Sequence, residues 1–336
     1  MLVNRFLTVP GAVTSPAIHG GSCAACSAPS LRLATAFEQV SRLFIVAGFI
    51  ALFPVGAFAA DIHLKGADGV EVVLPKPAER VVSLAPDLAE LLADVGAGAA
   101  LKGTVEYSDY PAEVKQVPRL GDAFHVDTER VVALKPDLVL AWEGGTPRAL
   151  IDRLRELNLP VLAVGTHELL DIAANLELLG VATGHGDAAQ LAAEDFRTRL
   201  GALRSRYANE PPIRVFYEIS AQPLFTVGGS QSISRLIQVC GGVNIFADLS
   251  ELAPAVSLET VLARDPEAIV SGDGEGDTAQ RFKDWQRWPK LAAVREGNFI
   301  AVNDEWISRS TPRILDAGKQ LCEALEKARA HRKAAD

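Results

Sequence analysis

Short apolar runs alternate with amphipathic stretches from residue 80 to residue 164, and this alternation predicts strands followed by helices. The predicted strands are Arg80–Leu84, Lys102–Glu106, Asp137–Trp142 and Pro160–Val164. Predicted helices begin at Pro86, Glu129 and Pro147 and end at Gly96, Pro136 and Leu157. Proline is common at the first position of a helix, and glycine or proline commonly follows its last residue. Strands that alternate with helices favour an α/β lobe with a parallel sheet.

The pattern changes between residues 187 and 208. Apolar residues recur there at spacings of three and four, at Ala188, Ala192, Phe196, Leu200, Leu203 and Tyr207. This spacing predicts one long amphipathic helix. The pair Pro211-Pro212 ends it, and Ile213–Ile219 begins a second series of strands and helices.

The second series repeats part of the first. Residues 129–140 (ERVVALKPDLVL) align with residues 259–270 (ETVLARDPEAIV), and each copy predicts a short helix, a proline stop and a buried strand. We therefore expect an α/β fold of two lobes, each with a parallel sheet flanked by helices, joined by one long interlobe helix. The predicted boundaries are 79–180 for the first lobe, 187–208 for the helix and 211–330 for the second lobe. A cleft between such lobes is the usual place for a ligand.

The N-terminus has the pattern of a secretory signal. Arg42 precedes the apolar run Leu43–Phe58, which ends in Ala57-Phe58-Ala59-Ala60. A charged residue, an apolar run and an A-x-A site predict cleavage near Ala59 or Ala60. The alternative is a membrane anchor, but Pro54 interrupts the run, which is shorter than a span of about 20 residues. We expect residues 1–59 to be an extension plus signal peptide, and the protein to be periplasmic.

Charge and cysteine content narrow the function classes. The chain has 336 residues and a formal net charge of −9, which argues against a nucleic-acid partner. Beyond residue 60 the chain keeps two cysteines, Cys240 and Cys322. In an oxidising compartment two cysteines indicate one disulfide, and two buried thiols are the alternative.

Aromatic residues gather in the loops after the predicted strands. They are Tyr107, Tyr110, Trp142, Phe225 and Trp306, and Arg309 follows closely. Flat rings provide apolar contact area for a large planar ligand, and an arginine binds amides or phosphate. For Trp285 and Trp288 we expect ordinary packing in the core.

Little in the sequence indicates a metal site or an enzyme active site. No H-x-x-H, H-E-x-x-H, G-x-S-x-G or Walker-A pattern is present in the chain, so we expect neither a metal site nor an enzyme. His125 is the one histidine placed to face a bound cofactor, although a lone histidine is more often structural. Glu129 and Glu259 lead the two repeats, either as helix-start carboxylates or as docking groups for a two-fold symmetric importer.

At these residues the chain resembles the periplasmic cobalamin-binding proteins of bacterial ABC importers, within the class III solute-binding proteins that also carry haem and ferric siderophores. The resemblance runs from about Arg80 to Leu325. The matching motifs are Tyr107–Pro111 (YSDYP), Glu129–Trp142, Pro223–Thr226 (PLFT), Val239–Phe246 (VCGGVNIF) and Trp306 through Ile314.

The resemblance implies a binding function without catalysis or a catalytic cofactor. Its expected partners are a corrinoid such as cobalamin and the permease subunits of an ABC importer, and we expect the free protein to be a monomer. It implies docking carboxylates at Glu129 and Glu259, a Cys240–Cys322 disulfide, and little hinge motion. The implied ligand contacts are Tyr107, Trp142, Phe225, Glu305, Trp306, Ile307, Ser308 and Arg309.

The chain departs from the family pattern at three positions. Ala123 and Ala253 stand where the cobalamin-binding proteins have tryptophan, and Ser308 stands where they have a carboxylate. Two missing aromatic walls widen the cleft or change what fills it, and Phe124 is placed to replace one. The open alternatives are therefore a haem or ferric-siderophore binder of the same fold, then a secreted α/β enzyme, then a sensing receptor domain.

Overall fold

The computed structural model describes residues 60–122, 125–274 and 278–335, which belong to one compact unit. The proposed signal segment, residues 1–59, lies outside the described residues. The first lobe is built on a four-stranded parallel sheet with the order β4-β3-β5-β6. Its strands are β3 (Val81–Ser83), β4 (Leu101–Gly103), β5 (Leu138–Trp142) and β6 (Val161–Val164), and an antiparallel hairpin of β1 (Ile62–Lys65) and β2 (Glu71–Leu74) precedes them.

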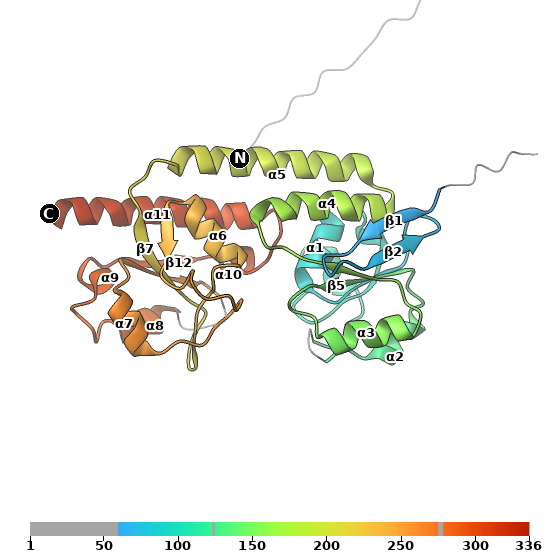
Figure 1. Ribbon diagram of the computed structural model, residues 1–336, viewed down its shortest axis with the longest axis horizontal. Helices are drawn as coiled ribbons and strands as arrows, with labels where there is room; N and C mark the ends of the chain where they lie inside the picture. Colours follow the sequence, from blue (N-terminus) through green and yellow to red (C-terminus); the bar gives the residue numbers. More distant parts are fainter. Residues whose placement is uncertain (1–59, 123–124, 275–277, 336) are drawn as a thin grey trace, which may run out of the picture. The chain divides into compact units, whose positions relative to one another are not determined.

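Helices cover both faces of this sheet (Figure 1). They are α1 (Pro86–Asp94), α2 (Thr128–Ala133), α3 (Arg148–Glu156) and α4 (Leu169–Thr183), with 3-10 turns η1 (Gly98–Ala100) and η2 (Ala112–Gln116). Successive strand residues point to opposite faces. Accordingly Val81 belongs to the core under α1 and α4, whereas Val82 belongs to the core under α2 and α3.

The second lobe repeats the arrangement with the strand order β10-β7-β11-β12, again all parallel. Its strands are β7 (Ile213–Glu218), β10 (Gly242–Asn244), β11 (Ala268–Gly272) and β12 (Phe299–Val302), with a small hairpin of β8 (Ser220–Ala221) and β9 (Leu224–Phe225). Its helices are α6 (Ser232–Val239), α7 (Leu258–Arg264), α8 (Thr278–Trp285), α9 (Ala292–Arg295), α10 (Asp304–Ile307) and α11 (Ile314–Ala335). The predicted α/β class with parallel sheets is confirmed.

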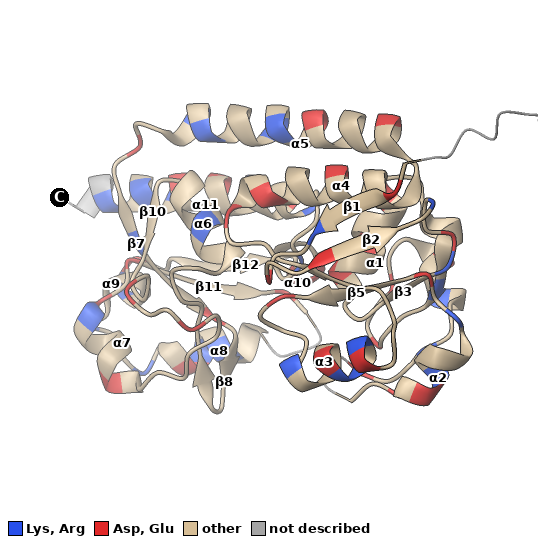
Figure 2. Ribbon diagram, turned by 45° about the vertical axis from the view of Figure 1, so that its right-hand side comes forward, with Lys and Arg blue, Asp and Glu red and all other residues tan. Residues whose placement is uncertain are grey.

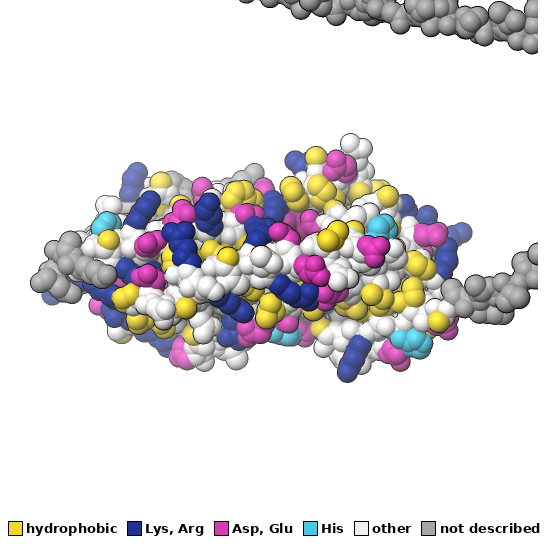
Figure 3. Space-filling view, turned by 90° about the horizontal axis from the view of Figure 1, so that it is seen from above, with side chains coloured by type: hydrophobic (Ala, Val, Ile, Leu, Met, Phe, Trp, Pro, Cys, Tyr) yellow, Lys and Arg dark blue, Asp and Glu magenta, His cyan; other side chains and the backbone are white. Residues whose placement is uncertain are grey.

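The chain passes between the lobes through one long helix, α5 (Gly186–Tyr207), packed against α4 (Figure 1). Its buried residues include Ala189, Ala193, Phe196 and Leu200, spaced by three and four. Figure 3, which looks down on this side, shows Lys, Arg, Asp and Glu side chains spread among small apolar areas. An amphipathic helix with one buried stripe is the expected outcome of that pattern.

A single apolar core runs under α4, α5 and α11 into both lobes. Leu176, Phe196, Leu236 and Leu321 come from four different helices and are all fully buried in it. Cys240, which follows α6, and Cys322 of α11 form a disulfide bond, as predicted. The separate core on the far side of the second sheet contains Trp285, with Trp288 packed against it, so both tryptophans pack as expected.

Candidate functional site

A cavity of about 1210 Å³ lies between the two lobes. Its walls follow the carboxyl ends of the strands in both parallel sheets: Asp87 comes after β3, Trp142 ends β5, Ile219 follows β7 and Asp304 follows β12. Ligands of parallel α/β folds bind outside the carboxyl ends of the strands, because the loops there converge. The volume suits a ligand at or above the size of an ordinary cofactor.

Two aromatic side chains of the first lobe stand exposed at this cavity. Tyr107 is 75% exposed and Trp142 is 36% exposed. The backbone of Tyr107 has φ of +63°, a left-handed conformation that costs a bulky residue about 1–3 kcal/mol. Arg309 Nη2 of the second lobe donates to the carbonyl oxygen of Tyr107 at 2.8 Å and holds this turn.

The turn after Trp142 is shaped by a glycine. A Cβ at Gly145 would lie within 2.0 Å of two atoms of the indole ring, so only glycine leaves room for the ring over the turn. The backbone N–H of Trp142 donates to Thr146 Oγ1 at 2.9 Å, which closes the turn from the other side.

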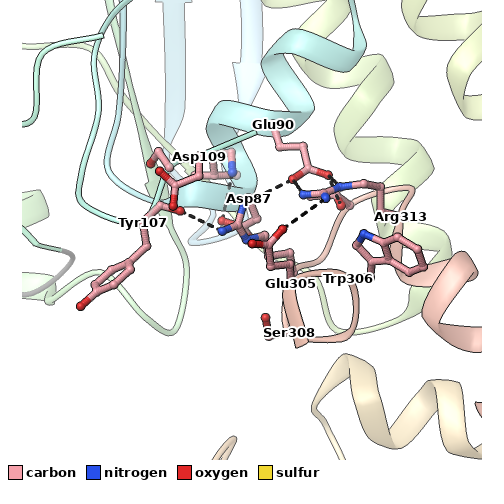
Figure 4. A network of polar contacts seen from close by, with 12 residues as sticks. Asp87, Glu90, Tyr107, Asp109, Glu305, Trp306, Ser308 and Arg313 are labelled. Carbon is pink, nitrogen blue, oxygen red and sulfur yellow. Dashed lines mark hydrogen bonds and ion pairs between the residues drawn. The ribbon is translucent and has the colours of Figure 1, made fainter. Parts of the chain in front are cut away.

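A buried polar network joins the lobes behind the cavity (Figure 4). Glu90 of α1 is fully buried and accepts hydrogen bonds from Thr311 Oγ1 and from Arg313 Nε, each at 2.6 Å. A second nitrogen of Arg313 completes a two-point contact with the carboxylate. The Arg313 guanidinium also lies over the ring of Tyr110, 3.8 Å from its centre. Glu90 and Thr311 are fully buried and the Arg313 side chain is 16% exposed, so the network ties the first lobe to the segment that precedes α11.

Burial alters the acidity of the carboxyl groups at the cavity. Burial, opposed by backbone hydrogen bonds and by Arg309 and aided by the nearby charge of Glu90, raises the pKa of Asp87 to about 6. It also raises the pKa of Asp304, against the attraction of Arg281 and Arg309. Desolvation disfavours the charged form of a carboxyl group, so these groups take up protons more readily than exposed ones.

The cavity is rich in carboxyl groups. Among the residues that the structure describes, six acidic side chains and a single arginine, Arg309, line it. The acidic residues are Asp87, Asp109, Glu143, Asp273, Asp304 and Glu305. The electrostatic potential of such a cavity opposes an anionic ligand.

Five of the residues implied as ligand contacts line this cavity: Tyr107, Trp142, Glu305, Ser308 and Arg309. The structure does not place the other three on its wall. Ile307 is fully buried in the core, and Trp306 packs against that core because α10 turns these two side chains inward. Phe225 lies in the β8–β9 hairpin, pairs with Ala255 through the backbone and is not among the lining residues.

The positions that depart from the family pattern have different outcomes. Ala253 lines the cavity, so this departure from the family pattern lies at the site itself. Ala123 and Phe124 lie outside the described residues. His125 is exposed and pairs with Asp122 at 3.2 Å, and it is not among the lining residues. The histidine that does line the cavity is His167, beside Glu143 at 3.5 Å.

Sequence reasoning missed several lining residues, among them Asp87, Glu143, His167 and Asp304. Each lies within four residues of the carboxyl end of a strand or begins the helix after it. The rule that such strand ends form the ligand crevice would have found Asp87, Glu143 and His167, since the strands before them were predicted, whereas β12, which precedes Asp304, was not. Residue type alone gave no signal, because carboxylates are common throughout the chain.

The two repeated carboxylates occupy matching exposed positions. Glu129 is the second residue of α2 and Glu259 is the second residue of α7. Helix α2 precedes β5 and α7 precedes β11, and these two strands occupy the same place in the strand orders of the two sheets. Side-chain oxygens of Asp127 and Ser257 cap the two helices in the same way. Backbone and Ser257 hydrogen bonds lower the pKa of Glu259. Figures 1 and 2 show α2 and α7 on the side of the protein opposite α5.

Within residues 60–122, 125–274 and 278–335 no helix has the length and apolar character needed to cross a membrane. In the same described part of the chain no group of three or more His, Cys, Asp or Glu side chains is arranged to hold a metal ion.

Residues 81–305 match the family model described as periplasmic binding protein. The vitamin B12-binding protein of Vibrio cholerae is 38% identical over 252 residues, which cover 75% of this chain and 91% of that protein. The crystal structure of the periplasmic vitamin B12 binding protein of Vibrio cholerae matches with a TM-score of 0.70 and 38% identity, over 75% of this chain and 98% of the other. A periplasmic heme-binding protein of Roseiflexus shares the fold, with a TM-score of 0.66 and 23% identity over 75% of this chain and 99% of that one. The chain therefore belongs to the periplasmic binding protein family.

Proposed function

We propose that this protein captures cobalamin or a related corrinoid in the periplasm and delivers it to an ABC importer, without catalysing a reaction. Relatives at 38% identity carry the name vitamin B12-binding protein, and they are covered over nine-tenths of their length. The acidic interlobe cavity, with six carboxyl groups and one arginine, is the observation that carries the proposal for this chain.

The charge of the cavity separates the corrinoid from its main rival. Haem carries two propionate carboxylates, and a cavity lined by carboxyl groups repels them. A corrinoid carries neutral carboxamides at its edge, and the positive charge of its cobalt–corrin centre balances its single phosphodiester group, so the same potential opposes it less than it opposes haem. Binding of haem or a ferric siderophore in place of a corrinoid is the alternative that a binding experiment has to distinguish.

For the binding mode, we assign the flat contacts to Tyr107 and Trp142, whose rings stand exposed at the cavity. Arg309, Ser308 and Glu305 are the proposed polar contacts to amides at the edge of the ligand. We propose that Trp306, Ile307 and Phe225 contribute by packing behind the wall rather than by touching the ligand. The small side chain of Ala253 leaves space that a larger lower substituent of the corrinoid fills.

For delivery, Glu129 and Glu259 are the proposed docking groups. They are exposed, one on each lobe, on the side opposite α5. Two matched carboxylates suit a partner with two-fold symmetry that presents one arginine from each subunit. Export through the predicted signal in residues 1–59 would place the protein in the periplasm, where such an importer collects its ligand.

Calorimetric titration of the purified protein tests which ligand it binds. Cyanocobalamin, cobinamide and haem are titrated in parallel at low salt and at 0.5 M NaCl. We expect one-to-one binding of the corrinoids and none of haem. Haem binding without corrinoid binding would overturn the ligand assignment and leave the family unchanged. If 0.5 M NaCl abolished the binding of every ligand equally, the binding would depend on charge rather than on the shape of the cavity.

A further inference from the structure

A side pocket of about 480 Å³ opens from the interlobe cavity into the second lobe. The two spaces share the lining residues Ile219, Gln231, Gly274, Asp304 and Ser308, so they are continuous. The pocket ends on Tyr217 and Glu218, at the carboxyl end of β7. A ligand in the cavity has room to extend one substituent into this pocket.

Glu218 has a carboxyl oxygen that lacks a partner. The side chain lines the pocket and the residue is 1% exposed. Its Oε2 accepts a hydrogen bond from Trp285 Nε1 at 2.6 Å, but its buried Oε1 accepts none from the residues that the structure describes. A buried acceptor without a donor costs about 1–3 kcal/mol, so such an atom calls for an explanation.

The other charged groups of the pocket restrict what the donor is. Asp304 lies on the shared wall, seated against Gly272, where a Cβ would come within 2.0 Å of its Oδ1. Arg281 also lines the pocket, and its guanidinium donates to the carbonyl oxygens of Ile219 at 3.0 Å and Gly272 at 3.3 Å. Two carboxyl groups repel an anion, and the nearby guanidinium repels a cation.

A neutral group that both donates and accepts hydrogen bonds fits this setting best. Burial raises the pKa of Glu218, opposed by the hydrogen bond from Trp285 and by the charge of Arg281, so this carboxyl group takes up a proton more readily than an exposed one. A primary carboxamide pairs with either form, because it offers N–H donors to a carboxylate and a carbonyl acceptor to a carboxylic acid.

We infer that the side pocket binds a primary carboxamide at the edge of the ligand, with one amide N–H donated to Glu218 Oε1. This inference rests on the proposed corrinoid function, since a corrin ring carries several primary carboxamides on flexible arms. The ring occupies the main cavity, and one arm reaches past Asp304 to Glu218. Glu218 and Asp304 thereby discriminate between an amide and a carboxylate at that arm.

The test uses cyanocobalamin and its three monocarboxylic acids, in each of which one propionamide is hydrolysed to a carboxylate. Each is titrated into the purified protein and into a Glu218→Gln variant at pH 7.5. One of the acids should bind the wild-type protein at least 10-fold more weakly than cyanocobalamin. Glu218→Gln should remove most of that difference, because glutamine is neutral, donates to a carboxylate and keeps an oxygen for Trp285.

Two further variants make the result specific. Glu267→Gln changes another buried carboxylate of the second lobe, bound to Arg214 and Arg332 away from the cavity, and should leave the amide-to-acid preference unchanged. Asp304→Asn acts on the same pocket through a half-buried side chain and should reduce the preference even if Glu218→Gln fails to fold.

The outcomes separate this inference from the function beneath it. Tight binding of cyanocobalamin with equal binding of all three acids overturns the carboxamide site and leaves the proposed function standing. A preference that survives both Glu218→Gln and Asp304→Asn overturns it as well. Absence of cyanocobalamin binding to the wild-type protein overturns the proposed function and the carboxamide site together.

Discussion

Single side chains set the chemistry of the cavity, and two kinds of group dominate it. Aromatic rings at Tyr107 and Trp142 supply flat apolar contact, while carboxyl groups around them set a negative potential. Apolar contact is proportional to the area removed from water, whereas the potential acts on the charge of the ligand. Affinity and selectivity are therefore separable by substitution.

Trp142→Ala should weaken corrinoid binding roughly 10- to 100-fold, because burial of a large side chain contributes about 1.5–3 kcal/mol. Calorimetric titration with cyanocobalamin measures the change. Trp288→Ala is the matched control, since Trp288 packs in the outer core of the second lobe and does not line the cavity. It should lower stability and leave affinity unchanged; the same loss of affinity in both variants would refute the role of Trp142.

Asp94 makes stability depend on pH. Burial and then the nearby charge of Glu90, opposed by Arg313, raise its pKa to about 7. An aspartate in the unfolded chain has a pKa of about 3.9, so the folded protein holds the extra proton between about pH 4 and pH 7. The free energy of unfolding should therefore fall as pH rises through this window.

Asp94→Asn should flatten that fall and stabilise the protein at pH 8 by roughly 1–2 kcal/mol, after allowance for the partial exposure of the side chain. Urea unfolding at pH 5, 6, 7 and 8 gives the slope. Asp195→Asn, at an exposed position on α5, should reproduce the wild-type slope. An unchanged slope in Asp94→Asn would exclude this carboxyl group as its source.

At the scale of elements, helix α1 and the segment between α10 and α11 hold the lobes together. The link between them is the fully buried carboxylate of Glu90, which accepts hydrogen bonds from Thr311 and Arg313. A second link joins Arg235 of α6 to Glu168, which precedes α4, at 2.8 Å. The lobes are thus joined at two places and by the continuous core under α4 and α5.

Glu90→Gln should lower the free energy of unfolding by roughly 2–4 kcal/mol, because it leaves the buried guanidinium of Arg313 without its counter-charge. Chemical denaturation measures the loss. Glu79→Gln makes the same change in an exposed pair with Lys76 and should cost about 0.5 kcal/mol or less. Equal effects of the two substitutions would show that the buried network adds no stability.

At the scale of the whole molecule, the two lobes share one strand order, and this places the repeated carboxylates at equivalent sites. β4-β3-β5-β6 corresponds to β10-β7-β11-β12, with α2 before β5 and α7 before β11. The repeat in the sequence is therefore a repeat of topology. The helices that carry Glu129 and Glu259, α2 and α7, lie on the side of the protein opposite α5 (Figure 2).

The double substitution Glu129→Ala with Glu259→Ala should leave corrinoid affinity unchanged and reduce importer-dependent uptake at least 10-fold at limiting protein, because two charged contacts to the importer are lost. Uptake of labelled cyanocobalamin into importer vesicles measures it. The control pair, Glu194→Ala with Glu326→Ala, changes exposed residues of α5 and α11 and should transport normally. Normal uptake by the Glu129 and Glu259 variant would refute the docking role.

Much of the fold was predictable from local pattern. The strands at 80–84, 137–142 and 160–164 and the long helix all lie within two residues of their predicted ends, because period and punctuation were clear there. Helices α4 and α11 were not predicted. Each packs into the central core along much of its length, and α4 is so apolar that it lacks the polar face that marks a surface helix.

The sequence by itself determined the α/β class, the repeat and the candidate aromatic residues, since these depend on neighbours along the chain. Only the tertiary structure decided which side chains meet. Tyr107 and Arg309 are 202 positions apart, and Glu90 and Arg313 are 223 apart, yet both pairs are in contact. Trp306 and Ile307 turn into the core while Ser308 faces the cavity, because α10 sets their directions. The spacing of residues shows the periodicity within one helix or strand. Which residues form a site between the lobes depends on how the helices and strands pack together.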